Sequence, residues 1–238
     1  MNRRKYVIVV AGGSGSRMGA AKPKQFLELG GKAILRRTIE VFLDACPDVN
    51  IIVVLPEEHM AYWKDYCYKY NFICPQILVK GGFTRFHSVK NALEKVPDGA
   101  LVAVHDGVRP LLTSGMVRSL FSTAETSQAV IPVTPCVDTM KVLQKKEWED
   151  GSQTYIAVPG QSVDRSLLYG AQTPQIFHSE LLKSAYKQAY DTSFTDDASV
   201  VERYGKSLSY VIGERLNIKI TTQEDLVLAE AILSLRKA

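Results

Sequence analysis

Tyr6-Val7-Ile8-Val9-Val10 runs directly into Ala11-Gly12-Gly13-Ser14-Gly15-Ser16-Arg17-Met18-Gly19, and Lys22-Pro23-Lys24-Gln25 follows. The apolar run predicts a buried strand, and the glycines after it predict a loop at the strand's end. Glycine lets backbone N–H groups approach phosphate oxygens, while arginine and lysine neutralise the charge that builds up during phosphate transfer. The segment therefore predicts an α/β protein that holds a phosphate chain.

This loop differs from the two commonest phosphate-binding motifs. The dinucleotide motif G-x-G-x-x-G fails because Met18 stands where the third glycine belongs. The motif G-x-x-x-x-G-K fails as well, because no glycine of the loop is followed by another glycine five residues later. The alternative interpretation is a flexible strand-to-helix turn with solvated charges. Three glycines within four residues are costly to order, which favours a ligand that needs them.

Size and composition set the limits of the function. A chain of 238 residues with 46% hydrophobic composition can bury a sizeable core, and we expect one domain over residues 1–238. The formal charge is +4, from 29 Lys and Arg against 25 Asp and Glu. This dispersed excess suits a small anionic substrate, and it lacks the basic run with interleaved aromatics expected for a nucleic-acid partner.

Cysteine spacing indicates whether the chain has a zinc site, and hydropathy indicates its cellular compartment. Cys46, Cys67, Cys74 and Cys136 form no C-x-x-C pair and do not cluster with the four histidines, so we expect reduced, buried thiols and no zinc site. The first apolar run is short and meets glycine, which predicts a strand rather than a signal peptide. No stretch reaches transmembrane length, so we expect a cytoplasmic protein with no membrane partner.

Strand-like and helical patterns alternate through the first half of the chain. Alternation of this kind predicts a doubly wound, mostly parallel, Rossmann-like sheet with right-handed crossovers. We expect further strands at residues 51–55, 77–79, 101–104 and 129–133, and helices at residues 33–43, 57–70 and 88–96. In such sheets, ligands bind beyond the carboxyl ends of the strands. The glycine loop, Gly81-Gly82 and His105-Asp106 all follow strands, so we expect them to line one cleft.

The pattern changes at about residues 138–160. Thr139–Leu143, a polar turn at residues 145–153 and Thr154–Val158 predict a β-hairpin, which either projects as an arm or packs at the sheet's edge. Near the end, Thr221-Thr222-Gln223-Glu224 predicts a capping box for a helix from Asp225 to about Leu235.

The loop G-G-x-G-S-R-M with P-K-Q resembles the signature of nucleotidyltransferases that activate sugar or sugar-alcohol phosphates. The resemblance is greatest to the 2-C-methyl-D-erythritol 4-phosphate cytidylyltransferase family of the non-mevalonate isoprenoid pathway, and ribitol-5-phosphate cytidylyltransferase is its near relative. It extends over nearly the whole chain as motifs in the family's order: Gly81-Gly82-Phe83-Thr84-Arg85-Phe86-His87-Ser88-Val89, His105-Asp106-Gly107-Val108-Arg109-Pro110, Asp138-Thr139-Met140-Lys141, Val163-Asp164-Arg165, Thr173-Pro174-Gln175, Thr195-Asp196-Asp197-Ala198-Ser199 and Asn217-Ile218-Lys219-Ile220-Thr221.

The resemblance implies a role for each matched residue. Those implied in catalysis are Arg17, Lys24, Arg165 and Lys219. Those implied in nucleotide binding are Ala11, Gly12, Gly13, Gly15, Gly82, Ser88, Asp106 and Gly107. Those implied in binding the acceptor are Asp106, Arg109, Thr139, Arg165, Thr173, Thr195 and Lys219. Thr195 also has the pattern of a helix N-cap, and Lys219 between two isoleucines predicts a mid-strand lysine on a face that opens on a cleft.

The reaction implied is that of CTP with 2-C-methyl-D-erythritol 4-phosphate, giving the CDP-alcohol 4-diphosphocytidyl-2-C-methyl-D-erythritol and pyrophosphate. Mg²⁺ is the implied cofactor, with Asp106 holding it or its waters. An acceptor phosphate ionised at neutral pH needs no general base, so His105 is given a packing role. In the family a projecting arm makes a homodimer, which would let Arg165 act on a partner's nucleotide.

Three other functions stay open at this point. A ribitol-5-phosphate cytidylyltransferase shares the loop motifs. A non-catalytic nucleotide-binding module predicts the loss of reaction cations, yet Arg17, Lys24, Arg165 and Lys219 are all present. An NAD-dependent dehydrogenase is disfavoured by Met18 at the third glycine's position.

Overall fold

The computed structural model describes residues 3–13 and 22–236. Within these residues, eight strands form one mixed sheet in the order β10-β7-β11-β6-β1-β4-β5, with β12 pairing on β7. The strands that pair in parallel with β1 or β4 make up one side of the sheet: β1 (Lys5–Val10), β4 (Asn50–Leu55), β5 (Gln76–Lys80) and β6 (Leu101–Asp106). The others are β7 (Ala129–Pro135), β10 (Tyr169–Ala171), β11 (Gln175–His178) and β12 (Ser209–Ile212). The predicted doubly wound sheet is confirmed.

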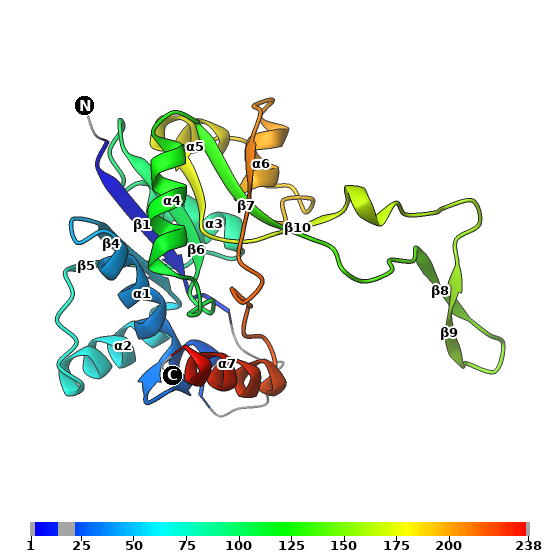
Figure 1. Ribbon diagram of the computed structural model, residues 1–238, viewed down its shortest axis with the longest axis horizontal. Helices are drawn as coiled ribbons and strands as arrows, with labels where there is room; N and C mark the ends of the chain where they lie inside the picture. The colour runs from blue at the N-terminus through cyan, green and yellow to red at the C-terminus, as the bar shows by residue number, and fades with distance from the viewer. Residues whose placement is uncertain (1–2, 14–21, 237–238) are drawn as a thin grey trace.

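Helices cover both faces of this sheet (Figure 1), as the alternating pattern predicts. One core lies under α1 (Ile34–Ala45), α2 (Glu57–Lys69) and α4 (Ser114–Ala124), and the other lies under α3 (Arg85–Leu93), α5 (Ser179–Ala185) and α6 (Asp197–Arg203). Successive β1 side chains alternate between them, because Val7 and Val9 join the first core and Ile8 joins the second. Burial on both faces explains why the strand is a continuous apolar run.

Some element boundaries differ from the predicted ones. Helix α3 begins at Arg85 and ends at Leu93, three residues earlier at each end than the predicted range, because Thr84 is its N-cap and accepts a hydrogen bond from His87 N. Helix α7 (Gln223–Leu235) begins after Thr222, whose capping box is completed by Asp225 and not by Glu224. The predicted strand around Lys219 is absent: this segment has no regular structure, although Ile220 N donates to Val108 O.

A long β-arm projects from the body of the protein (Figure 1) and ends in the antiparallel pair β8 (Leu143–Glu147) and β9 (Gln153–Ala157). The hairpin prediction is confirmed, but its first strand lies four residues later than predicted. All five residues of β8 are exposed, so hydrophobic alternation does not mark this strand. At the turn, Trp148 N donates to Ser152 O, Gly151 N donates to Trp148 O, and Gly151 has a positive φ.

The remaining short elements connect these layers. They are the 3₁₀ turns η2 (Lys24–Phe26) and η3 (Arg165–Leu167) and the small pair β2 (Glu28–Leu29) and β3 (Lys32–Ala33). All four cysteines are free, as predicted, although only Cys46 is buried and the other three are half-buried. None of the helices in the described part of the chain has the length and apolar character needed to cross a membrane.

Candidate active site

A pocket of about 300 Å³ lies where three parallel strands end. Ala11, Gly12 and Gly13 follow β1, Gly82 follows β5, and Asp106 closes β6. Because neighbouring parallel strands bring their carboxyl ends to one edge, motifs about 70 residues apart in sequence meet there. The three motifs predicted to share a cleft therefore do so.

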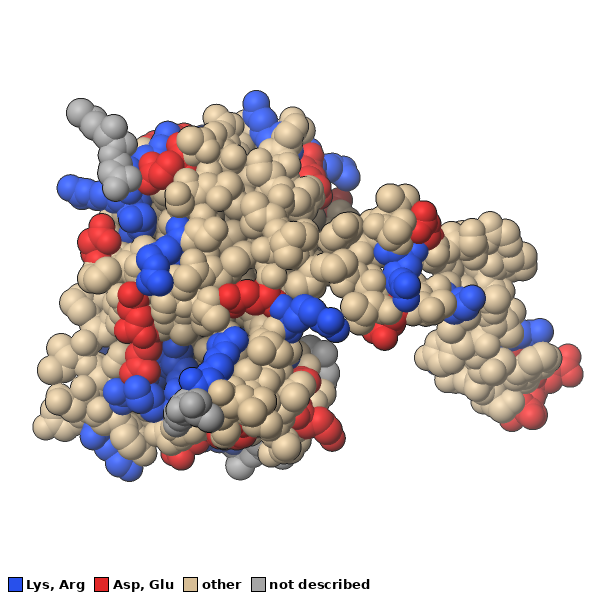
Figure 2. Space-filling view, viewed as in Figure 1, with Lys and Arg blue, Asp and Glu red and all other residues tan. Residues whose placement is uncertain are grey.

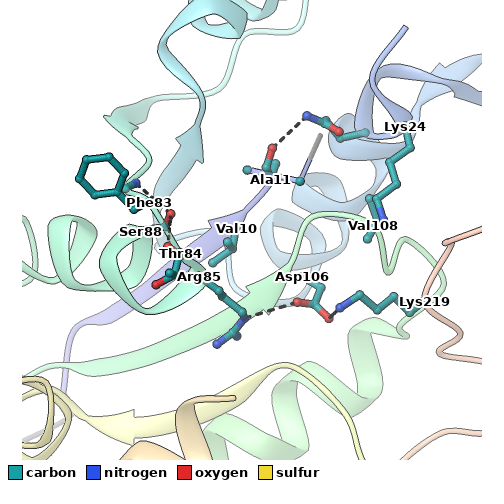
Figure 3. Close-up of a pocket in the computed structure, with 14 residues that line it drawn as sticks. Val10, Ala11, Lys24, Phe83, Thr84, Arg85, Ser88, Asp106, Val108 and Lys219 are labelled. Atoms are coloured by element: carbon teal, nitrogen blue, oxygen red, sulfur yellow. Dashed lines mark hydrogen bonds and ion pairs between the residues drawn. The ribbon is translucent and has the colours of Figure 1, made fainter. Parts of the chain in front are cut away.

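The pocket is contiguous with a second hollow of about 740 Å³, with which it shares Gly12, Gly82, Phe83 and Ser88. Together they make an elongated cleft with glycine backbone along one wall. In the pocket view the Phe83 ring points away from Asp106 (Figure 3), and this side chain is fully exposed. An elongated cleft of this kind suits a nucleotide, whose base and phosphates need different walls.

The first wall is held in place by hydrogen bonds to the backbone. Gln25 is buried, and its Nε2 donates to Ala11 O at 2.9 Å, which fixes the start of the glycine loop. On the opposite side, Ser88 Oγ accepts from Gly82 N at 3.0 Å and donates to Thr84 O at 2.9 Å. Its hydroxyl proton is therefore already in use, and Ser88 has only acceptor capacity left for a base.

Two glycines are required by close packing. A Cβ on Gly82 would clash with His87 Cβ, and a Cβ on Gly107 would lie 3.0 Å from Ala11 Cβ and 3.2 Å from Val10 O. Gly107 N also donates to Val10 O at 2.8 Å. Gly107 thus lies behind the described pocket wall and lets β1 and β6 end side by side, which places Ala11 against Asp106.

Asp106 is the carboxylate around which the basic side chains gather. Its Oδ2 lies 3.1 Å from both Arg109 Nε and Lys219 Nζ, and its Oδ1 lies 3.9 Å from Arg85 Nε. Figure 3 shows Asp106 between Arg85 and Lys219, which reach it from opposite sides. Burial alone would raise the pKa of Asp106, but Arg85, Lys219 and Arg109 together hold it well below its usual range. The group is therefore a carboxylate throughout the neutral pH range.

Lys24 approaches the same pocket from the first loop. It opens η2 directly after Pro23, and its Cε would lie 3.8 Å from a Cβ built on Gly13. The described lining thus contains three basic side chains, Lys24, Arg85 and Lys219, and one acidic side chain, Asp106. An excess of cations in a pocket walled by glycine backbone favours an anionic ligand.

His105 is a structural residue, in agreement with its predicted packing role. It is fully buried, its ring packs edge-on against Phe42, and burial lowers its pKa to about 4. Nε2 lies 3.2 Å from Arg109 O, which only accepts, so the neutral ring carries its proton there. Nδ1 must then accept from the Thr173 hydroxyl, 3.0 Å away.

This hydrogen-bond direction limits what Thr173 can offer a ligand. Its Oγ1 also accepts from Asp106 N at 3.1 Å. With its proton given to His105, the hydroxyl has a lone pair left, and it can accept from a substrate hydroxyl but not donate to a phosphate. Arg109 is likewise tied to the fold, because its Nη1 donates to Asn217 O at 2.8 Å.

Several predicted site residues lie elsewhere. Gly15 and Arg17 are outside the described residues. Thr139 and Arg165 are exposed at the base of the arm, where Arg165 Nη1 donates to Val137 O at 2.9 Å. Neither is among the described residues that line the pocket, which places the two halves of the predicted site apart within one chain.

Thr195 is also separated from the pocket. It is exposed and lines a different hollow of about 630 Å³ together with Leu167, Tyr169 and Tyr210. The N-cap prediction for Thr195 is wrong, because Asp196 caps α6 in a capping box with Ser199. Asp196 Oδ1 accepts from Ser199 N at 2.9 Å.

A magnesium ion fits this site only in company with phosphate. No group of three His, Cys, Asp or Glu side chains able to hold a metal occurs in the described part of the chain. Asp106 is a single carboxylate that already contacts cations. Mg²⁺ is commonly held by one or two carboxylates plus substrate phosphates, so Asp106 fits as the one protein ligand of an ion that binds together with a triphosphate.

Comparison with known proteins decides the family. The model of the family described as IspD, 2-C-methyl-D-erythritol 4-phosphate cytidylyltransferase, matches residues 6–235. The chain belongs to this family. Proteins named 2-C-methyl-D-erythritol 4-phosphate cytidylyltransferase from Phocaeicola vulgatus and Porphyromonas gingivalis are 48% and 44% identical to it, over 98% of this chain and the whole of each relative. The family members are nucleotidyltransferases, and so is this enzyme.

Solved structures agree with the sequence comparison. The fold matches the crystal structure of 4-diphosphocytidyl-2C-methyl-D-erythritol synthase from Anaerococcus prevotii with a TM-score of 0.78 and 28% identity, over 98% of this chain and 100% of that chain. It also matches the 2-C-methyl-D-erythritol 4-phosphate cytidylyltransferase from Thermus thermophilus with a TM-score of 0.71 and 30% identity, over 98% and 99% of the two chains. Both likenesses extend over the arm as well as the sheet.

Sequence reasoning missed some residues that shape the pocket. Gln25 and Arg85 each stand within a motif of the sequence, but no role is predicted for either. Asp197, which accepts a hydrogen bond from Arg85, and Tyr186, which donates to Asp197, are likewise given no role. A buried acidic residue implies a basic partner, but the sequence pattern around Asp197 does not show that it is buried.

Proposed function

We propose that this enzyme joins CTP to 2-C-methyl-D-erythritol 4-phosphate and releases pyrophosphate. The observation that carries the proposal is the pocket itself: glycine backbone and the cations Lys24, Arg85 and Lys219 surround one carboxylate, in a chain of the cytidylyltransferase family. The product is 4-diphosphocytidyl-2-C-methyl-D-erythritol, an isoprenoid precursor intermediate. A phosphate-binding pocket by itself does not select the acceptor; the family membership does.

The chemistry proposed is an in-line displacement. An oxygen of the acceptor phosphate forms a bond to the α-phosphorus of CTP, and the bond from that phosphorus to the bridging oxygen of pyrophosphate breaks. No covalent enzyme intermediate is needed. Catalysis then consists of positioning and charge stabilisation, in which Lys24 and Arg17 neutralise the charge that develops on the five-coordinate phosphorus.

In this proposal the other residues form two half-sites, one for the nucleotide and one for the acceptor. Gly12, Gly13, Gly82 and Ser88 would hold the nucleotide, for which the contiguous cleft provides the space. Lys219 would hold the acceptor phosphate, and the neighbouring hydroxyl of Thr173 would accept from an acceptor hydroxyl. Mg²⁺, held by Asp106 and the triphosphate, would supply further neutralisation of phosphate charge when bound.

We also propose that the arm joins two subunits into a cytoplasmic homodimer. Both faces of β8 and β9 are largely exposed, including Leu143, Tyr155 and the adjacent Trp148, and a two-stranded hairpin is marginal on its own. A second subunit would cover these side chains. In such a dimer Thr139, Arg165 and Thr195 of one subunit would complete the acceptor half-site of the other, and the four free thiols suit a reducing compartment.

The test measures pyrophosphate release from CTP with each of two acceptors, 2-C-methyl-D-erythritol 4-phosphate and ribitol 5-phosphate, in the presence of Mg²⁺. We expect release with the first acceptor, and little with the second or when ATP, GTP or UTP replaces CTP. Release with ribitol 5-phosphate alone would refute the substrate assignment. Binding of CTP with no release from either acceptor would favour a non-catalytic nucleotide-binding module.

A further inference from the structure

We propose that Arg85 is a positioning residue of this site, which the buried pair Asp197 and Tyr186 holds in the orientation that fixes Asp106. The proposal rests on the proposed function for its kinetic test, but its geometric basis is independent of the substrate. It links α3, α5 and α6 on the far face of the sheet to the pocket at the sheet's edge.

The first link of this network is a buried carboxylate. Arg85 Nη2 donates to Asp197 Oδ2 at 2.6 Å, and the Tyr186 hydroxyl donates to Asp197 Oδ1 at 2.6 Å. The Asp197 side chain has no exposed surface. Both carboxylate oxygens are thus occupied by charge-assisted hydrogen bonds, which are the shorter and stronger kind.

Tyr186 is itself held rigidly. Its ring stacks on Phe86, with centroids 4.6 Å apart, and Phe86 follows Arg85 in α3. Burial raises the pKa of the Tyr186 hydroxyl well above its ordinary value, so the group stays a proton donor at any physiological pH. The tyrosine thereby fixes Asp197 from behind while Arg85 holds it from the pocket side.

The second link divides the two oxygens of Asp106 between different partners. Arg109 and Lys219 both contact Oδ2 at 3.1 Å, whereas the Arg85 ion pair is with Oδ1, at 3.9 Å from Nε. A separation of 3.9 Å is an ion pair rather than a direct hydrogen bond. Arg85 therefore sets the direction of the carboxylate and leaves Oδ1 accessible to a ligand or a bridging water.

The burial pattern favours positioning over mere stabilisation. Asp197 has no exposed surface, while the Arg85 side chain is 28% exposed and lines the pocket. A buried ion pair is a weak source of stability, because desolvation offsets its attraction, and an apolar pair of the same volume would serve the core as well. A rigid guanidinium that ends in the pocket has a use that an apolar pair lacks, since it orients Asp106.

The decisive experiment compares Tyr186→Phe in two backgrounds. Phenylalanine keeps the stack on Phe86 and removes only the hydrogen bond to Asp197. In the otherwise unchanged enzyme we expect kcat to fall about fivefold to twentyfold, with KM for CTP changed less than threefold. In an Arg85→Gln background the same substitution should change kcat less than twofold, because its route to Asp106 is gone. Equal losses in both backgrounds would overturn the proposal.

Tyr66→Phe is the matched control. Tyr66 is also a buried, stacked tyrosine with a hydrogen bond, which it accepts from Ala33 N at 2.9 Å, but it lies outside the pocket. We expect a similar change in Tm for both tyrosine variants and an unchanged kcat for Tyr66→Phe. A fall in kcat of the same size in the control would assign the effect to stability alone.

A second readout does not depend on turnover. In the NMR spectrum of the whole protein, the Nη2–H signal of Arg85, the group that donates to Asp197, should exchange slowly with water and lose this protection in Tyr186→Phe and in Asp197→Asn. If the enzyme released no pyrophosphate with any acceptor, the proposed function would fail and this readout would still test the network. Equal exchange rates in all three proteins would overturn the positioning role.

Discussion

The pocket and the arm are built on opposite principles. In the pocket, the described functional side chains are held by at least one partner within the same chain: Asp106 contacts three cations, and Arg109 contacts Asn217. On the arm, by contrast, β8 and β9 pair only with each other, and Leu143, Trp148 and Tyr155 are about half exposed or more. Figure 2 shows the arm as a narrow projection whose visible surface is mostly uncharged.

This difference between the pocket and the arm separates the predicted site residues that one chain brings together from those that it does not. The described pocket is assembled at strand ends of a single sheet, from residues of one chain. Of the residues predicted to bind the acceptor, Lys219 lines the pocket and Thr173 is buried beside Asp106, but Thr139 and Arg165 lie at the base of the arm. The arm has exposed apolar side chains close to predicted site residues that lie away from the pocket. This combination is expected of an interface through which a second subunit completes the site.

The largest effect is expected in the pocket, from Lys24→Ala. Loss of a cation that stabilises the transition state should lower kcat at least 100-fold, in line with the removal of one charge-stabilising donor. Lys22→Ala is the matched control: its ammonium lies over the Tyr62 ring, 5.2 Å from the centroid, and it should keep more than half of the wild-type rate. Pyrophosphate release measured with both variants checks this. Similar rates for the two would show that Lys24 is not a reaction cation.

The arm should show the next largest effect. When residues 143–157 are replaced by a short Gly-Ser linker, we expect activity to fall at least tenfold and the protein to become monomeric in light scattering. The Tm should change by less than about 3 °C, because β8 and β9 contribute no side chain to the hydrophobic clusters of the described residues. A monomer with full activity would contradict the idea that the arm completes the site.

A smaller effect is expected of pH on the free energy of unfolding, and it arises at His105, next to the pocket residue Asp106. Burial lowers the pKa of His105 from its ordinary value of 6.5 to about 4, although Asp106 next to it opposes the shift. Between pH 4 and 6.5, His105 therefore binds a proton in the unfolded chain but not in the folded chain. The free energy of unfolding should fall as pH drops from about 6.5 to 4, by up to about 3 kcal/mol.

Denaturant unfolding at several pH values measures this loss. In His105→Gln the group that titrates is gone, so the dependence on pH in this window should become flatter. His178→Gln, at a half-buried histidine outside the pocket, is the control and should keep the wild-type slope. An unchanged slope in His105→Gln would show that His105 is not the group responsible.

The sheet and the pocket could be predicted from sequence because burial leaves a pattern. Strands such as β1 and β4 are buried on both faces, so each is a continuous apolar run, and glycine after such a run marks the strand end. Motifs at the carboxyl ends of parallel strands must converge, which made the grouping of Gly12, Gly82 and Asp106 predictable from topology.

Features that depend on long-range contacts or on exposure could not be predicted. β8 is exposed on both faces, so no hydrophobic period distinguishes Gln144–Glu147 from a polar turn. Lys219 lies in an irregular segment held by Ile220 N on Val108, although its apolar neighbours imitate a strand. The contact of Arg85 with Asp197 joins positions 112 residues apart, and no local pattern records such a pair.

The central claim, that two chains complete each other's site, is tested most directly by mixing inactive variants. Lys24→Ala and Arg165→Ala chains are co-refolded in equal amounts, and pyrophosphate release is compared with that of each variant alone. Half of the dimers should be mixed, and each mixed dimer holds one site with both residues intact, so we predict recovery to about a quarter of wild-type activity. Activity no higher than the average of the two variants would contradict the claim and place Arg165 in the site of its own chain.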